Sequence, residues 1–213
     1  MKIIYQAQKE YPEKLNNIYS SPAKLYLVGD ALVLNKPSIA IIGCRDASDY
    51  GKRVAFNFAY ELAKEGLVIV SGLARGIDTY AHLGAVKANG KTIAVLGSGL
   101  KHIYPAENKE LCNEIVKKGG AVITEYEPHI KPLPMNFPSR NRIISGLSNG
   151  VLVVEAKQKS GTLITVDYAL EQGKDVFVIP GNITSTNSYG TNDLIKQGAK
   201  PVTNIQEIIE EII

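Results

Sequence analysis

The sequence predicts a doubly wound α/β fold, a mostly parallel sheet with helices on both faces. Short apolar runs recur along the chain without the alternation of a half-exposed strand, which is typical of strands covered on both faces. Each run leads into small or glycine-rich residues and then into a helical pattern long enough for a right-handed crossover. This alternation indicates a parallel sheet.

The predicted strands share β-branched apolar residues and, in chain order, span 39–43, 67–72, 92–97, 121–124, 151–155 and 176–181. The predicted helices share a helical period, and most end just before a glycine, a typical C-cap; they span 51–65, 77–89, 107–118, 139–147, 162–172 and 204–212. We therefore expect one α/β domain over 37–213. Residues 1–36 are expected to form a short, packed N-terminal extension.

Composition sets the broad class. The 213 residues are 45% hydrophobic and 21% charged, enough for one full core. A net charge of +3 decides little, so a nucleic-acid argument must rest on local clusters. Cys44 and Cys112 lack CxxC spacing, which favours reduced thiols over a disulfide framework or a metal site. No apolar stretch approaches the roughly 18 residues of a membrane span, so we expect a cytoplasmic protein without a membrane partner.

The candidate site lies in the loops that follow the strands, because ligands of open α/β sheets bind beyond the strands' carboxyl ends. Five of these loops are rich in Gly, Ser and Thr, and they span 43–51, 71–82, 97–105, 155–165 and 180–192. Their backbone amides and hydroxyls can cradle phosphate oxygens. The alternative, that the glycines only close tight turns, stays open for each loop taken alone.

Two common phosphate ligands are disfavoured. A dinucleotide site would need GxGxxG, but Gly97 and Gly99 are followed by His102 where the third glycine belongs. The second strand ends at Ser71-Gly72 rather than at an acid for the ribose, and no GxxxxGK[ST] motif is present. We expect neither an NAD nor an ATP cofactor.

Basic and aromatic residues in these loops favour single-stranded nucleic acid, which proteins hold with cations along the backbone and aromatic faces under the bases. The basic residues expected near the strands' carboxyl edge are Arg45, Arg75, Lys101, Arg140, Arg142, Lys157 and Lys159. The candidate stacking residues are Tyr50, Tyr104, Phe137 and Tyr189. Half-buried packing is the favoured interpretation of each tyrosine taken separately, whereas for Phe137 packing and stacking are equally favoured.

Catalytic candidates are few. Asp78 and His82 are four residues apart and would share a helix face, a spacing that suits a metal or a general base but also simple structural roles. Glu155, at a strand end, is the only carboxylate that we consider for catalysis.

Six ordered blocks resemble the DNA-processing protein A family (DprA/Smf) over nearly the whole chain: IIGCRDASDYG, SGLARGIDTYAH, TIAVLGSGLKHIYPAEN, NFPSRNRIISGLS, VLVVEAKQKSGTLITVDYALEQG and VFVIPGNITSTNSYGTNDLIKQGA. The resemblance implies an extended Rossmann-like domain that binds single-stranded DNA, is not an enzyme and commonly forms homodimers. It further implies a role in natural transformation and recombination, with protection of the strand and loading of the RecA recombinase. The chain looks like a minimal version consisting mainly of this domain.

The family's Gly-Ser-Arg motif falls on Gly43-Cys44-Arg45, and its FPxRNRI segment falls on Phe137 to Ile143. Cys44 replaces the usual hydroxyl residue, and Pro134 stands where some members place a DNA-contacting lysine, a role that Lys131 could take over. The full set of expected DNA- or phosphate-binding residues is Gly43, Cys44, Arg45, Ser71, Gly72, Arg75, Gly76, Phe137, Arg140, Asn141, Arg142, Ser160, Gly161 and Thr162.

Arg140, Asn141 and Arg142 cannot all face one way on a helix. We expect Asn141 to brace neighbouring loops and leave open which arginine contacts DNA.

Two alternatives remain. A nucleoside monophosphate phosphoribohydrolase would carry PGGxGTxxE, and here only Ser160-Gly161-Thr162 echoes it. A partner-recruiting scaffold with a decayed DNA site is the other.

Overall fold

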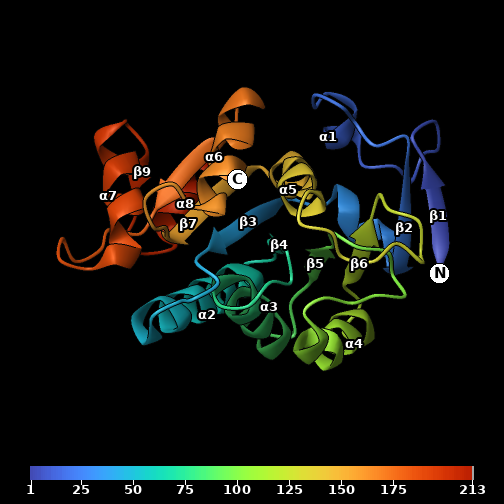
Figure 1. Ribbon diagram of the computed structural model, residues 1–213, viewed down its shortest axis with the longest axis horizontal. Helices are drawn as coiled ribbons and strands as arrows, with labels where there is room; N and C mark the ends of the chain where they lie inside the picture. The colour runs from blue at the N-terminus through green and yellow to red at the C-terminus, as the bar shows by residue number, and fades with distance from the viewer. Residues whose placement is uncertain (213) are drawn as a thin grey trace.

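The computed structural model describes residues 1–212 and shows one nine-stranded sheet with helices on both faces (Figure 1). The strands are β1 (Lys2–Tyr5), β2 (Lys24–Gly29), β3 (Ser38–Gly43), β4 (Val68–Ser71), β5 (Thr92–Val95), β6 (Ala121–Thr124), β7 (Gly150–Glu155), β8 (Asp175–Val178) and β9 (Lys200–Pro201). Their order in the sheet is β1-β2-β6-β5-β4-β3-β7-β8-β9. The pairs from β6 to β9 are parallel, whereas β2 pairs antiparallel with both β1 and β6.

Eight α-helices are found among the described residues: α1 (Glu13–Asn16), α2 (Asp49–Lys64), α3 (Ile77–Lys87), α4 (Lys109–Lys117), α5 (Asn136–Leu147), α6 (Gly161–Glu171), α7 (Tyr189–Lys196) and α8 (Gln206–Ile212). Three 3-10 helices span Ala31–Asn35, Ala106–Asn108 and Thr186–Ser188. Within residues 1–212, no helix is both long and apolar enough to cross a membrane.

The helices form two layers. One core cluster joins the sheet to α1, α5, α6 and α7, and includes Leu15, Ile143 and Val166. A second joins the opposite sheet face to α2, α3 and α8, and includes Leu62, Ile77 and Ile208. In Figure 1, α2, α3 and α4 lie below the sheet and α5 and α6 above it. The buried strands have apolar side chains pointing into both layers, which explains their unbroken apolar runs.

The predicted α/β fold is confirmed, and the predicted elements all form with bounds that shift by a few residues. The largest shifts are at α5, which begins at Asn136 rather than at 139, and at β8, which ends at Val178 rather than at 181. Five strands or α-helices were not predicted: β1, β2, β9, α1 and α7. The first two extend the sheet antiparallel from residues 1–36, because Lys24–Gly29 pairs with β6 over Tyr26↔Thr124 to Gly29↔Ala121.

The chain reverses direction across the sheet between β3 and β7. From β3 it steps outward through β4, β5 and β6, and it then returns to the other side of β3 to form β7, β8 and β9. The loops after β3 and β7 therefore diverge at their carboxyl ends, which leaves a crevice at this switch point.

Candidate nucleic-acid interface

A cavity of about 600 Å³ occupies this crevice. Its walls come from the loops after β3, β4, β5 and β7 and from the first turns of α5 and α6. Of the expected site residues, those that line it are Gly43, Cys44, Arg45, Phe137, Arg140, Asn141, Ser160, Gly161 and Thr162. We call this cavity the switch-point pocket.

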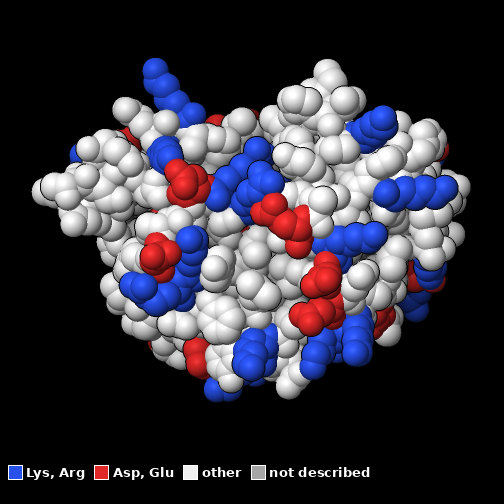
Figure 2. Space-filling model, turned by 60° about the horizontal axis from the view of Figure 1, so that its bottom comes forward, with Lys and Arg blue, Asp and Glu red and all other residues white. Residues whose placement is uncertain are grey.

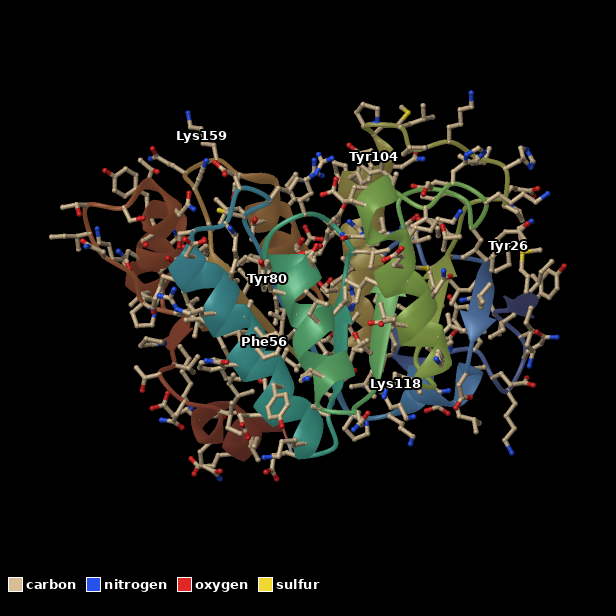
Figure 3. The ribbon with its side chains drawn as sticks, turned by 90° about the horizontal axis from the view of Figure 1, so that it is seen from below. Tyr26, Phe56, Tyr80, Tyr104, Lys118 and Lys159 are labelled. Atoms are coloured by element: carbon tan, nitrogen blue, oxygen red, sulfur yellow. The ribbon has the colours of Figure 1, made fainter. Side chains whose placement is uncertain are left out.

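An arginine and two aromatic rings form one wall of the switch-point pocket. The guanidinium carbon of the exposed Arg45 lies 5.3 Å from the ring centroid of Phe137, a cation–π distance. The Phe137 ring lies 5.6 Å from that of Tyr104, tilted by 49°. Gly97 permits this approach, since a Cβ there would lie 2.8 Å from the Phe137 ring. In Figure 3, Tyr104 and Lys159 lie at the same upper edge of the molecule, on either side of its centre.

The first turn of α6 supplies backbone donors to a second wall of the pocket. Ser160, Gly161 and Thr162 line the pocket where the amides of a helix's first turn have no partner within the helix. The hydroxyl of Ser160 is buried and has no hydrogen-bond partner among the described residues. No atom lies within 4 Å of the position that a Cβ on Gly161 would take, so this end is open to a ligand. Such a terminus favours an anion.

Arg140 lies at the bottom of the pocket and is only 3% exposed. Its Nη1 donates to the carbonyl oxygen of Gly72 at 2.6 Å and to that of Val95. Burial lowers the pKa of Arg140 to about 10, so the guanidinium stays charged at neutral pH. Arg140 therefore joins α5 to the ends of β4 and β5.

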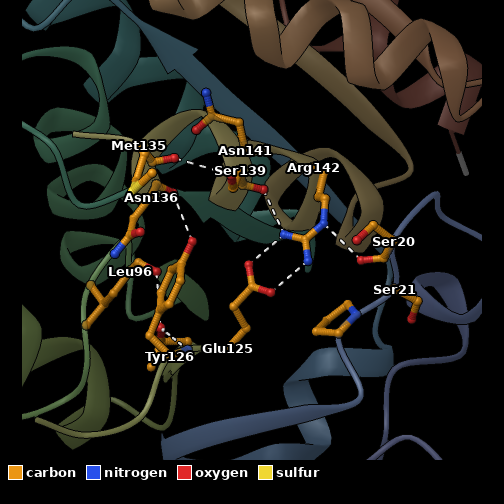
Figure 4. Close-up of polar contacts among 12 residues, drawn as sticks. Ser20, Ser21, Leu96, Glu125, Tyr126, Met135, Asn136, Ser139, Asn141 and Arg142 are labelled. Carbon is orange, nitrogen blue, oxygen red and sulfur yellow. Dashed lines mark hydrogen bonds and ion pairs between the residues drawn. The ribbon is translucent and has the colours of Figure 1, made fainter. Parts of the chain in front are cut away.

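Arg142 points away from the pocket and is held by a bidentate ion pair (Figure 4). Its Nη1 and Nη2 donate to the Glu125 carboxylate at 2.6 and 2.7 Å, and its Nε donates to the carbonyl oxygen of Ser20 at 3.0 Å. Asn141 is half-buried, lines the pocket and has one long contact, 3.5 Å from its amide nitrogen to the carbonyl oxygen of Gly161. The bracing contacts of this segment thus come mainly from the two arginines.

Sequence reasoning missed Glu125, although a carboxylate directly after β6 was an available signal.

The other expected residues lie next to the pocket without lining it. The Ser71 hydroxyl donates to the carbonyl oxygen of Ile41 at 2.7 Å, and Gly72 lies against the Arg140 guanidinium. Arg75 forms an exposed bidentate pair with Glu107, at 2.8 and 2.9 Å.

Gly76 has a φ of 73°, and a Cβ on it would overlap the carbonyl oxygens of Cys44 and Arg45. It therefore lets the β4 loop pack against the β3 loop.

Two buried carboxylates, Glu155 beside the pocket and Asp78 in its lining, are hydrogen-bonded within the protein. Glu155 is 3% exposed; it accepts from the Ser48 amide at 3.0 Å, from the Ser48 hydroxyl and from the Asn187 amide at 3.2 Å. Asp78 accepts from the amides of Gly72 at 3.1 Å and Ala74 at 3.3 Å. Burial raises the pKa of Asp78. Both carboxylates shape the surrounding loops.

His82 does not act with Asp78 as a site. It is fully buried, and its Nδ1 lies 2.7 Å from the Thr92 hydroxyl. Among residues 1–212, no group of three or more His, Cys, Asp or Glu side chains is placed to hold a metal ion. The structural interpretation of the Asp78–His82 spacing is the one that the contacts support.

Charge on the protein surface is mixed. On the face in Figure 2, basic and acidic side chains alternate without forming one continuous positive stripe. Near the pocket, Lys157 lies 3.2 Å from Asp46, and Arg75 is paired as described. Arg45 is the cation of the β3 loop that has no ion pair within the described residues, and it is the one stacked on Phe137. Tyr50 and Tyr189 are exposed and do not line the pocket.

Comparison with known proteins gives consistent matches. A sequence model of the family "DNA recombination-mediator protein A" matches residues 2–213. The DNA processing protein DprA of Bacillus subtilis is 45% identical over 97% of this chain and 69% of its own length. Protein Smf of Escherichia coli is 46% identical, over 95% of this chain and 54% of its own length. The chain thus spans roughly half to seven-tenths of these relatives.

Two solved structures that superpose well on this chain are also DNA processing protein A structures. DprA from Streptococcus pneumoniae superposes with a TM-score of 0.93 at 44% identity, over all of this chain and 74% of that one. DNA processing protein A from Helicobacter pylori, described for its unique single-stranded DNA binding mode, superposes with a TM-score of 0.88 at 34% identity. This superposition covers 99% of the present chain and 95% of the Helicobacter pylori chain. A molybdenum cofactor binding protein from Rippkaea orientalis shares the fold, at a TM-score of 0.58 and 22% identity.

Proposed function

We propose that this chain, which belongs to the DNA recombination-mediator protein A family, binds single-stranded DNA in the switch-point pocket. It is a DprA-type DNA-processing protein by its relatives, and the Helicobacter pylori structure is described as one that binds single-stranded DNA. The proposal concerns what this chain's own residues do with such a strand.

The observation that carries the proposal is the stack of Arg45, Phe137 and Tyr104 at the pocket wall. A base that stacks on Phe137 meets a ring whose position is already fixed by its contacts with Arg45 and Tyr104. Stacking of a base on an aromatic side chain contributes about 1–3 kcal/mol and is tolerant of sequence. Arg45, which has no ion pair among residues 1–212, is left to neutralise the phosphate beside that base.

The first turn of α6 offers a second phosphate position in the same pocket as Arg45. The amides near Gly161, the unpartnered Ser160 hydroxyl and the Thr162 side chain all line the same wall. Phosphates at helix N-termini are stabilised by free amides and by the helix dipole. One strand can therefore pass between the two walls with its base toward Phe137.

Arg140 and Arg142 enter the proposal as residues that hold α5, because their guanidinium groups are bound to protein partners. Cys44 is 6% exposed, and its backbone amide donates to the carbonyl oxygen of Glu155 at 3.0 Å. It shapes the Arg45 loop through its backbone. Substitution of the usual hydroxyl residue by Cys44 thus need not weaken this wall.

We further propose that the protein binds DNA without catalysis. Glu155 lies beside the pocket and accepts three hydrogen bonds from Ser48 and Asn187. Asp78 lines the pocket, and its Oδ2 is occupied by the backbone amides of Gly72 and Ala74. Incubation with AMP tests this part: release of adenine would support the phosphoribohydrolase alternative.

The wider role is proposed on family membership alone. It comprises protection of incoming strands in DNA uptake, loading of a RecA-type recombinase in the cytoplasm, and a homodimer. Strand exchange by the recombinase on coated DNA, with and without this protein, tests the loading step.

The direct test is the binding of a fluorescent oligo-dT by Arg45→Ala and Phe137→Leu. Loss of one phosphate contact should lower the slope of log affinity against log salt by about 0.7. Loss of the stacking face should weaken binding roughly 5- to 100-fold at an unchanged slope. Arg53→Ala is the matched control, an exposed arginine on α2 outside the pocket.

Wild-type affinity in both pocket variants would overturn the assignment of the site, and a wild-type protein that fails to bind oligo-dT would favour the scaffold alternative.

A further inference from the structure

Helix α5 carries Phe137, Arg140 and Asn141 into the switch-point pocket, yet its sequence is a poor helix former. NFPSRNRIISGL contains two Asn, two Ser, one Pro, one Gly and two β-branched Ile, and no Ala, Glu, Gln or Lys. Such residues disfavour helix, and a 12-residue helix is marginal in water even with favourable residues. Its N-terminus also lacks a side-chain cap. Tertiary contacts must therefore hold α5 in place.

Residues 14–20 of the N-terminal segment provide contacts along the distal half of α5. Leu15 and Ile18 pack on Gly146 so closely that a Cβ there would lie 2.8 Å from Leu15 and 3.0 Å from Ile18. One turn earlier, Arg142 reaches the carbonyl oxygen of Ser20. We call Lys14, Leu15, Ile18 and Ser20 the α5 clamp.

Lys14 closes the clamp at the C-terminal end of α5. Its ammonium lies 3.3 Å from the carbonyl oxygen of Leu147, the last residue of the helix, and 2.6 Å from the side-chain oxygen of Asn149. It also lies 3.2 Å from the carbonyl oxygen of Lys36, just before β3, and 3.3 Å from the hydroxyl oxygen of Ser38, the first residue of β3. The Ser38 hydroxyl also donates to the Leu147 carbonyl oxygen, at 2.8 Å, so Lys14 and Ser38 share this end of the helix. A cation at a helix C-terminus additionally stabilises the helix dipole. Lys14 thus fixes the end of α5 to the strand next to β7.

We propose that Lys14 is a positioning residue for the switch-point pocket, acting through α5 from its far end. Ten residues of helix separate Phe137 from Leu147, roughly 15 Å. Because α5 has little helical stability of its own, loss of the Lys14 ammonium should loosen its C-terminal turn, which Ser38 then holds without a cation. We expect this loosening to lower the fraction of molecules in which α5 is intact and Phe137 lies against Arg45. This inference rests on the proposed function for its consequence in binding, but the anchoring of α5 is independent of DNA.

The test compares Lys14→Met, which keeps the apolar stem, with Lys14→Arg, which keeps a cation. Amide hydrogen exchange is followed in residues 136–147, and oligo-dT affinity is measured below the unfolding transition of each variant. Lys14→Met should exchange α5 amides about tenfold faster and bind about tenfold more weakly, since affinity falls with the fraction of molecules in the binding-competent state. The salt slope should not change, because no phosphate contact is removed. Lys14→Arg should restore both readouts in part.

The control for general destabilisation is Ile208→Ala. Ile208 is fully buried in the core cluster on the other face of the sheet, so its truncation lowers global stability without a contact to α5. Lys2→Met controls for loss of an exposed ammonium that pairs with Glu10. If Lys14→Met does not fold, Lys14→Gln, which retains two donors, takes its place in the same comparison.

The proposal would be overturned if Lys14→Met showed the wild-type rate of α5 amide exchange and the wild-type affinity for oligo-dT. It would also be overturned if Ile208→Ala, at the same stability as Lys14→Met, lost as much affinity. If wild-type protein does not bind oligo-dT, the proposed function fails, whereas the exchange of α5 still decides whether Lys14 anchors the helix.

Discussion

Protonation of His82 should make the protein markedly less stable in mild acid. The Thr92 hydroxyl donates to the carbonyl oxygen of Ile69 at 2.6 Å, so the His82 Nδ1–H donates to the Thr92 oxygen. The other ring nitrogen, Nε2, is buried without a partner among the described residues. A proton there would place a charge where nothing accepts its hydrogen bond. Burial accordingly lowers the pKa of His82 to about 3, helped by the positive charge of Arg140.

The size of the effect follows from proton linkage. The folded-state pKa is depressed, so the stabilisation is fully present above the unfolded pKa of about 6.5 and is lost as the pH falls toward the folded value. Between pH 7 and pH 5 only the unfolded chain takes up the proton. This difference lowers the free energy of unfolding by about 2 kcal/mol.

Urea unfolding at pH 7 and pH 5 measures this loss directly. His82→Gln removes the titrating group, while His102 and His129 remain in both proteins and cancel in the comparison. Wild type should lose about 2 kcal/mol more than the variant over this interval, with an unchanged m-value. The same pH dependence in both proteins would refute the assignment of His82 as a buried neutral residue.

Two substitutions test the braces around the pocket. Gly76→Ala should lower the free energy of unfolding by roughly 1–3 kcal/mol and weaken oligo-dT binding, because the new Cβ must displace the Arg45 loop. Gly173→Ala is the control: Gly173 also has a positive φ, 65°, but its Cβ position is in open space. This variant should lower the free energy of unfolding by only about 1 kcal/mol and leave binding unchanged. Equal effects in the two would contradict the loop contact. Glu125→Ala should lower the free energy of unfolding, measured in urea, by about 3 kcal/mol, because Arg142 is left charged and buried. A decrease of less than about 1 kcal/mol would mean that the Arg142–Glu125 pair behaves as an exposed ion pair.

The centre of the sheet was predictable because its strands are covered on both faces, and such strands appear in the sequence as continuous apolar runs. The antiparallel edge formed by β1 and β2 was not predictable in this way. In β2 a lysine and a glycine flank the apolar residues, and β1 has only Ile4 buried, so neither carries the same signal. Helix α7 begins within a Ser-, Asn- and Gly-rich stretch that reads as a loop, and its place is set by contacts with distant elements.

The position of the pocket was predictable from the strand ends, whereas the roles within SRNR were not. Arg140 is held by carbonyls at the ends of β4 and β5, and Arg142 by a carboxylate after β6. None of these partners is near in sequence. Asn141, expected as a brace, lines the pocket because the helix turns it away from both arginines.

The hydrogen bonds around Glu155 have a consequence for the kinetics of the proposed binding of a DNA strand. The Glu155 carboxylate holds Ser48, at the start of α2, and the side chain of Asn187, while the Glu155 backbone carbonyl accepts from the Cys44 amide. The backbone on either side of Arg45 is therefore held before any ligand arrives. A preorganised loop loses little conformational entropy on binding. Association should then need no slow rearrangement of this wall, and the lifetime of the complex rather than its rate of formation should respond to changes in the pocket.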